Sequence, residues 1–119
     1  MVRGVRGAIT ITEDTPEEII RATQEMLTTL MDKNGFAVED VVSAIFTVTP
    51  DITSEFPARS ARLMGWTHVP LMCSQEIPVP GALPRCIRVL LHVNTDKSQA
   101  EVKHAYLRGA AVLRKDIAD

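Results

Sequence analysis

The chain has 119 residues, of which 45% are hydrophobic and 24% charged, and its formal net charge is −2. This length and composition predict one globular domain over residues 1–119, without a disordered tail. The slight negative charge and the few aromatic residues argue against a nucleic-acid binder. Because no signal-peptide core and no apolar run of roughly 20 residues is present, we expect a cytoplasmic protein that does not contact membranes.

Arginine dominates the basic residues, with nine of the thirteen. Several of these arginines lie in apolar or glycine-rich surroundings, where a solvated surface more often has lysine. The guanidinium group forms paired hydrogen bonds to a carboxylate or a phosphate, so the bias favours recognition of such anions.

Cysteine and histidine give no indication of a metal site. Cys73 and Cys86 form no C-x-x-C motif, and the three histidines follow no metal-binding spacing. We therefore expect free thiols, ordinary histidines and no bound metal.

The first predicted element is a strand over residues 2–11. Its residues alternate, with Val5 and Ile9 on one face and Arg6 and Ala8 on the other. The neighbours of Arg6 on its own face are small, which leaves space above the strand.

A capping box predicts the start of a long helix. Thr15 is the N-cap, Pro16 takes the first helical position and Glu18 the third. Apolar residues then keep helical spacing, and Asn34 and Gly35 provide a left-handed stop.

The middle of the chain predicts a strand over residues 41–48, a short helix within residues 56–66 and a strand over residues 69–75. In the short helix, Arg59 and Arg62 are three residues apart. They are therefore neighbours on the helix surface.

The C-terminal part predicts the most apolar strand, over residues 86–93, then a helix and a last strand. Arg88 interrupts this strand, and its permanent charge must meet an anion or water. A second capping box at residues 98–101 predicts a helix that includes Tyr106, and residues 109–114 predict a short final strand.

Together these elements predict about five strands and two substantial helices in the order βαβαββαβ. The fold class is therefore α+β (mixed α/β), with one sheet covered by helices. The face with Arg6, and with Arg88 if that residue shares it, needs another cover. A second copy of the chain is the simplest one.

Several segments, none sufficient alone, occur in a distinctive order over nearly the whole chain: RGVRGA, TPD, FPAR, GW, VPLMCSQE, CIRVLLHVNTD and HAYLRGAAVLRKD. In combination they resemble the AroH class of monofunctional chorismate mutases. The resemblance implies a pseudo-α/β-barrel homotrimer with an active site at each subunit interface. It also implies isomerisation of chorismate to prephenate, for phenylalanine and tyrosine biosynthesis, without a metal or organic cofactor.

The same resemblance implies roles for individual residues. Arg88 would lie by the ether oxygen of the substrate, and Glu76 would contact its ring hydroxyl. Arg6 would bind the side-chain carboxylate, assisted by Tyr106. The other implied substrate-binding residues are Phe56, Ala58 and Arg62 from the neighbouring subunit, together with Arg59, Leu71, Met72, Cys73, and Leu113 and Arg114 in the tail.

This rearrangement requires no nucleophile and no proton transfer, and the sequence offers no Ser/His/Asp or Cys/His grouping. It is helped by holding the reactive conformer and by a cation placed where negative charge develops. A preorganised donor of this kind contributes ~3 to 4 kcal/mol. Arg88, fixed by a strand, is the predicted donor.

The residues alone leave blander interpretations open. Arg88 can simply pair with a core carboxylate such as Glu76, and Arg62 can be a solvated charge. Cys73 and Tyr106 can be packing residues. The arginines interpreted as ordinary surface residues are Arg3, Arg85 and Arg108.

Two other functions remain open. One is a trimeric small-molecule binder or an imine deaminase of the YjgF type, which would use arginine for a substrate carboxylate. The other is a structural module whose exposed sheet face binds a partner protein.

Overall fold

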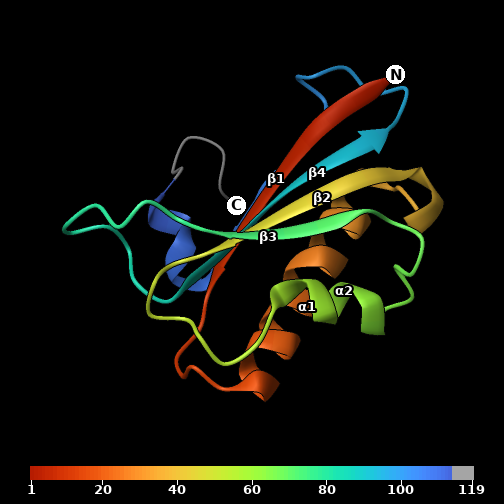
Figure 1. The fold of residues 1–119 in the computed structure, drawn as a ribbon. Helices are drawn as coiled ribbons and strands as arrows, with labels where there is room; N and C mark the ends of the chain where they lie inside the picture. Colours follow the sequence, from red (N-terminus) through yellow and green to blue (C-terminus); the bar gives the residue numbers. More distant parts are fainter. Residues whose placement is uncertain (114–119) are drawn as a thin grey trace.

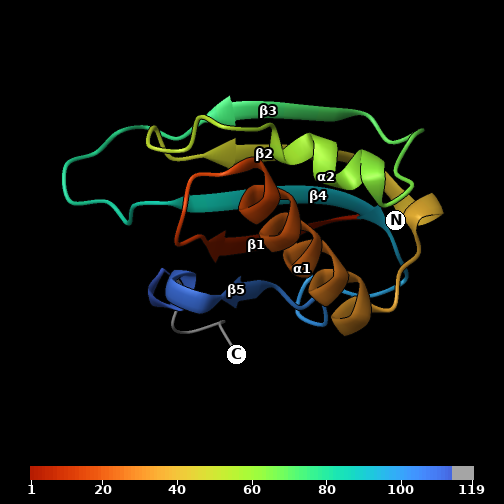
Figure 2. The ribbon, with the colours of Figure 1, turned by 90° about the horizontal axis from the view of Figure 1, so that it is seen from below.

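The computed structural model describes residues 1–113 and contains one five-stranded sheet with both α-helices on the same face (Figures 1 and 2). The predicted α+β class is confirmed. The elements, in chain order, are β1 (Val2–Thr10), α1 (Pro16–Asn34), the 3₁₀ turn η1 (Val38–Asp40), β2 (Val41–Val48), α2 (Pro57–Leu63), β3 (Leu71–Gln75), β4 (Cys86–Asn94), β5 (Ala105–Leu107) and the 3₁₀ turn η2 (Arg108–Val112).

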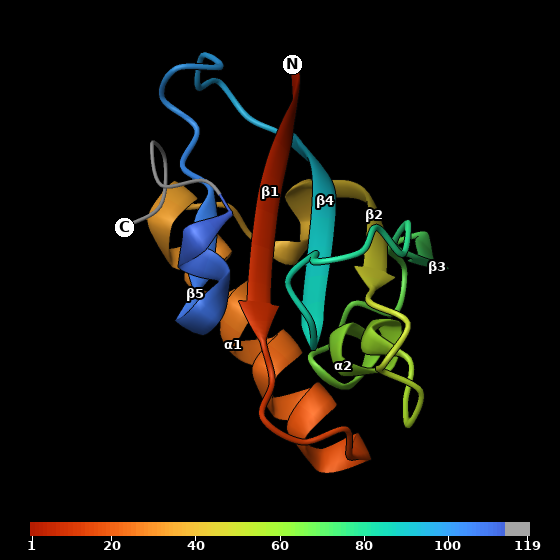
Figure 3. The same cartoon turned by 90° about the vertical axis from the view of Figure 1, so that its left-hand side faces the viewer.

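The strand order is β3-β2-β4-β1-β5, which places β4 at the centre of the sheet. β4 is antiparallel to both of its neighbours, β1 and β2. The edge strands β3 and β5 run parallel to β2 and β1, and β5 lies beside β1 in Figure 3. The most apolar predicted strand is therefore the central one of the five.

Strand alternation divides the side chains between two faces. Val5 and Ile9 are buried under the helices, as predicted. In register, Ala8 lies opposite Arg88, and Arg88 lies opposite Thr47 on β2. The face away from the helices, here called the open face, thus bears Arg6, Ala8, Ile45, Thr47, Arg88 and Leu90.

Gly7 permits a close approach between β1 and α1. A Cβ atom at this position would lie 2.9 Å from Leu30 Cδ1 and 3.0 Å from Met26 Cγ. These distances are too short for an unstrained contact, so the packing of α1 on β1 requires the absence of a side chain here.

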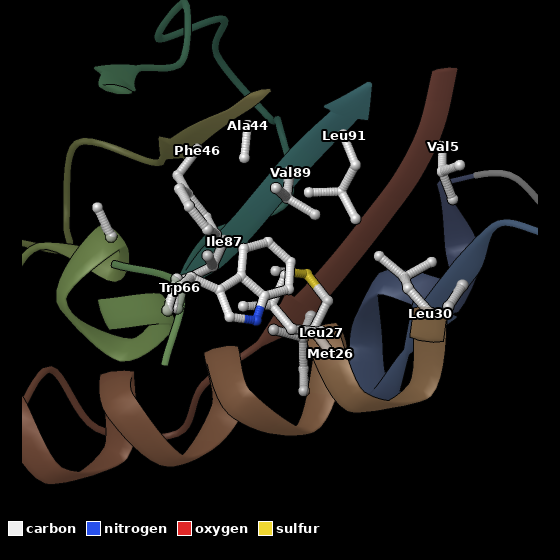
Figure 4. Close-up of a cluster of buried hydrophobic side chains, with 14 of the residues drawn as sticks. Val5, Met26, Leu27, Leu30, Ala44, Phe46, Trp66, Ile87, Val89 and Leu91 are labelled. Carbon is white, nitrogen blue, oxygen red and sulfur yellow. The ribbon is translucent and has the colours of Figure 1, made fainter. Parts of the chain in front are cut away.

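The hydrophobic core fills the space between the helices and the sheet. Figure 4 shows Trp66 with its ring between α1 and the strand residues, near Met26, Leu27 and Ile87. Trp66 and Phe46 are among the largest fully buried side chains. The single tryptophan thus fastens the segment after α2 to the centre of the core.

Both predicted caps of α1 are present. Thr15 Oγ1 accepts a hydrogen bond from the Glu18 backbone N–H at 3.2 Å, and Gly35 has φ +69° and donates to Met31 O. α1 is the longest helix. Among residues 1–113, neither it nor any other helix is both long and apolar enough to cross a bilayer.

The prediction of a helix after Ser98 is wrong, because the described structure has none between β4 and β5. Ser98 and Glu101 do form the reciprocal capping hydrogen bonds, at 2.8 and 3.3 Å, but the turn does not continue. The chain instead adds β5 to the edge of the sheet, where Tyr106 pairs with Ala8. A local helix signal is overridden here by hydrogen bonding with a distant strand.

The predicted final strand over residues 109–114 is also wrong. Residues 108–112 form η2, and residue 114 lies outside the described residues. A smaller difference is that β3 begins at Leu71 rather than at Val69. Arg108, which has φ +54°, marks the change from β5 to η2, and the following Gly109 N–H donates to Thr10 Oγ1 of β1.

Arg108 is more than the surface residue that the sequence predicted. Its guanidinium donates to Thr10 O at 3.1 Å, to Glu18 at 3.4 Å and to Glu25 at 3.0 Å. Burial would raise the pKa of Glu18, but hydrogen bonds from Arg108 and Arg21 outweigh this effect and lower the pKa. Arg108 therefore ties η2 to the first turns of α1.

Glu18→Gln should lower the free energy of unfolding by about 1–3 kcal/mol at neutral pH, because it weakens charged hydrogen bonds to a buried group. The folded pKa of Glu18 lies below the unfolded value, so the wild-type advantage exists above about pH 4.5 and is lost as the pH falls through the folded pKa.

Urea unfolding at about pH 7 and about pH 3, at one protein concentration, checks this prediction. The control is Glu17→Gln, an exposed change in the same helical turn. An equal loss of stability in both variants, or a Glu18→Gln deficit that persists in acid, would contradict the assigned role.

Candidate active site

The cavity lined by Arg88, here called the Arg88 cavity, has a volume of about 240 Å³. Much of its lining comes from the loop of residues 76–85, which projects beyond the sheet before β4 (Figures 1 and 2). The lining is largely apolar apart from a few polar groups, and it comprises Thr49, Pro50, Asp51, Glu76, Ile77, Pro78, Val79, Ala82, Leu83, Pro84 and Arg88.

Arg88 emerges from the central strand between two short side chains. Its cross-strand neighbours are Ala8 and Thr47, neither of which can cover a guanidinium. The side chain is 42% exposed, and its Nε lies 3.6 Å from Glu76 Oε2. This Nε is buried without a hydrogen-bond partner among the described residues, so donor capacity remains at the edge of the cavity.

Glu76 is held in place from two sides. Its backbone N–H donates to Val48 O at 2.9 Å, which continues the pairing of β3 with β2. Its carboxylate accepts a hydrogen bond from Thr47 Oγ1 through the oxygen that faces Arg88. The predicted pairing of Arg88 with Glu76 therefore exists, but at a cavity wall and not in the core.

Thr47 is a site residue that the sequence reasoning missed. It lies directly opposite Arg88 and donates to Glu76, and it thus links the two predicted catalytic residues. The sequence shows that Thr47 lies in the predicted strand 41–48. That it faces Arg88 follows only from the register between β2 and β4, which no local sequence pattern predicts.

The TPD segment fixes the start of β4. Thr49 Oγ1 accepts from the Cys86 N–H at 3.0 Å and donates to Asp51 at 2.5 Å. Asp51 also accepts from the Arg85 N–H at 3.0 Å. Arg85 has φ +52°, an unfavourable conformation for a residue other than glycine, and these contacts hold it directly before β4, three residues ahead of Arg88.

A small second cluster of buried residues adjoins this end of the open face. It consists of Ala8, Cys86, Tyr106 and Ala110, with Leu83 and Leu113 packed against it. Burial raises the pKa of the Cys86 thiol, although the nearby charge of Arg88 opposes the shift. Tyr106 is 5% exposed and reaches this place from β5, not from the predicted helix.

The other group of predicted residues lines a different hollow, here called the Phe56 cavity, of about 320 Å³. Its lining residues are Phe56, Ala58, Arg62, Leu71 and Cys73. Cys73 pairs with Phe46 and Leu71 with Ala44, which places both on the helix-covered face of the sheet. Arg88 faces the other side. One chain therefore distributes the predicted site over two separate hollows.

Besides Tyr106 and Leu113 in the second cluster, three more predicted residues line neither cavity. Arg6 is exposed on the open face, two residues from Ala8, and its backbone N–H donates to His104 Nδ1 at 2.9 Å. Met72 is 67% exposed on the same face. Arg59 forms an ion pair with Glu55 at 2.8 Å.

Glu55 also caps the start of α2. Its carboxylate accepts from the Phe56 N–H at 2.9 Å as well as from Arg59. These hydrogen bonds lower the pKa of Glu55. Within residues 1–113, no group of three or more histidine, cysteine, aspartate or glutamate side chains could hold a metal ion.

Comparison with solved structures identifies the class of fold. A chorismate mutase from Clostridium thermocellum superposes with a TM-score of 0.91 at 51% sequence identity, covering 92% of this chain and 98% of that one. The likeness extends to curated sequences. The chain is 54% identical to chorismate mutase AroH of Thermus thermophilus, over 98% of this chain and 97% of the relative. It is 44% identical to chorismate mutase AroH of Bacillus subtilis, over 98% and 93%.

The family model for chorismate mutase type I matches residues 2–117. The chain belongs to this family, which confirms the resemblance that its motifs indicated. It is an isomerase of the AroH class, and the imine-deaminase and partner-binding alternatives are set aside.

The environment of Cys86 predicts an unreactive thiol. A thiol reagent at about pH 8 should modify Cys86 only after unfolding, because the side chain is fully buried and its pKa is raised. Peptide mass spectrometry checks this prediction, with urea-denatured protein as the positive control. Rapid modification of Cys86 in the native protein would contradict the packing described here.

Proposed function

We propose that this chain isomerises chorismate to prephenate by a Claisen rearrangement, in active sites completed by neighbouring copies of the chain. The main support for this proposal is the position of Arg88, a fixed cation on the central strand that lies beside the Glu76 carboxylate at the wall of a cavity. Membership of the chorismate mutase family supplies the substrate class. The two free cysteines fit a reducing compartment, and we place the enzyme in the cytoplasm.

Arg88 would stabilise the ether oxygen of the substrate. As the C–O bond breaks, this oxygen gains negative charge that is absent in the ground state. A guanidinium already held by a strand needs no reorganisation when the charge appears, so its stabilisation is larger in the transition state than in the substrate.

Glu76 would accept a hydrogen bond from the ring hydroxyl. Thr47 fixes the orientation of its carboxylate, and the charge of Arg88 keeps that carboxylate on the cavity side. A second negative group, correctly placed, also favours a ring that becomes electron-poor during bond breaking. The two residues thus match opposite charges that develop at different ends of the reacting system.

The remaining contacts require more than one chain. Phe56 is 66% exposed and Arg62 is exposed on α2, both beside the Phe56 cavity and away from Arg88. We propose a homotrimer in which the Phe56 cavity of one subunit closes the Arg88 cavity of the next. Arg6 and Tyr106 would bind the side-chain carboxylate, while Arg59, Leu71, Met72, Cys73, Leu113 and Arg114 would complete the enclosure.

The direct test is incubation of the purified protein with chorismate and measurement of its diene absorbance. Loss no faster than in buffer alone would end this proposal. Mass determination in solution tests the assembly separately, since a monomer that turns over chorismate would retain the reaction and reject the shared site.

Arg88→Lys should fold and assemble normally but lose about 100- to 1000-fold in kcat, because a flexible ammonium cannot reproduce the placed guanidinium. Steady-state kinetics with chorismate give the measurement. The control is Arg3→Lys at the other end of β1, where Arg3 Nε donates to Lys97 O at 3.0 Å. Wild-type turnover in Arg88→Lys would refute the role assigned to Arg88.

A further inference from the structure

Hydrogen bonds to the carboxylate of Asp14 hold the segment before Phe56. Asp14, just before α1, accepts hydrogen bonds from the Thr53 N–H at 3.1 and 3.2 Å and from Thr53 Oγ1 at 3.0 Å. It also accepts from the Ser54 N–H at 3.2 Å, and Ser54 Oγ donates to Asp14 O at 2.7 Å. Asp14 and the residues that it binds are about 40 positions apart in the sequence.

We propose that Asp14 is a positioning residue for the half of the active site that each chain presents to its neighbour. The inference rests on the proposed function, in which Phe56 and α2 complete the Arg88 cavity of an adjacent subunit. Asp14 would contact no substrate. It would act by fixing the segment of residues 52–56, and hence the direction of Phe56.

The segment needs such an anchor in addition to Glu55, whose carboxylate holds the junction with α2. α2 has only seven residues, too short to be stable without tertiary contacts, and its N-cap Phe56 provides no side-chain hydrogen bond. Thr53 and Ser54 are both exposed. Only Ile52 is buried, so the chain between Ile52 and Pro57 depends on polar contacts for its path.

A carboxylate suits this position better than a neutral side chain. Three donors converge on Asp14, and an ionised carboxylate can accept from all of them without presenting a donor of its own. Partial burial alone would raise the pKa of Asp14, but the hydrogen bonds from Thr53 and Ser54 lower it. Asparagine would turn an NH₂ group toward at least one of these donors.

Asp14→Asn should therefore lower kcat/KM for chorismate by about tenfold, with KM raised more than kcat is lowered, because the closing residues are displaced and the catalytic pair is not. The matched control is Asp40→Asn. Asp40 also accepts a backbone hydrogen bond, from Ala37 at 2.9 Å, but it follows the other end of α1, a helix about 28 Å long. The control should retain wild-type kinetics.

Mixed assemblies separate a positioning role from a merely structural one. Asp14→Asn and Arg88→Lys chains are unfolded together in equal amounts and refolded. If Asp14 acts on the neighbour's site, about a quarter of the sites combine an intact Arg88 half with an intact Phe56 half. Activity should then be several times the mean of the two parent proteins.

A second mixture, of Phe56→Ala with Arg88→Lys, tests the premise independently. Recovery in this mixture without recovery in the Asp14→Asn mixture would overturn the inference and leave the shared site intact. Failure of both mixtures would reject the shared site, and the inference with it. Recovery in both supports the inference.

A folding defect in Asp14→Asn would be detected by circular dichroism and by mass in solution. In that event Thr53→Val replaces it, since this change removes one donor to Asp14 with little change in shape. We expect a smaller loss of kcat/KM, about two- to fivefold, again recovered in the mixture with Arg88→Lys. Unchanged kinetics in Thr53→Val, or no recovery, would overturn the inference.

Discussion

The structure depends on a permanent charge held in the middle of a β-sheet. Arg88 is tolerated on the central strand because its neighbours Ala8 and Thr47 are short and because its side chain faces away from the helices. The same arrangement leaves the guanidinium 3.6 Å from Glu76, close enough for attraction and too far for a hydrogen bond. A charge only partly satisfied by its own chain retains the capacity to bind an anion. Stability would favour complete pairing of Arg88 within the chain, whereas binding an anion requires that part of its hydrogen-bonding capacity stays unused.

The rest of the fold meets these demands by fixing backbone on either side of the charge. The TPD segment holds the start of β4, and Thr47 orients the carboxylate. Farther away, Arg108 ties the C-terminal turn to α1, and Asp14 ties the Phe56 segment to the approach to the same helix. Each connection uses a side-chain charge or hydroxyl to hold a segment at the end of a strand or helix, or a side chain at the cavity wall. The regular elements give the sheet its shape, and these polar contacts give the loops theirs.

The sequence predicted the elements whose signals are local. The alternation of apolar and polar residues predicted β1, and the Thr15 cap and Gly35 predicted the two ends of α1. The apolar run predicted β4, with Arg88 on it. The site pair Arg88 and Glu76 followed from a family resemblance, and the structure places the two residues together. What could not be predicted depends on pairing between distant segments. The Ser98 capping box is a valid local signal that lost to the edge of β1, and Thr47 and Asp14 matter only through a register and a contact some 40 residues away.

Gly7 has a consequence beyond the contact that it permits. The hydrogen atom at this position sets the spacing between β1 and α1, since even a methyl group would collide with Leu30. Asp14 lies directly before that helix and Glu18 in its first turn, so a displaced α1 would move both residues with it. A side chain added at position 7 would therefore act on the C-terminal turn and the Phe56 segment together, through the helix that both of them contact.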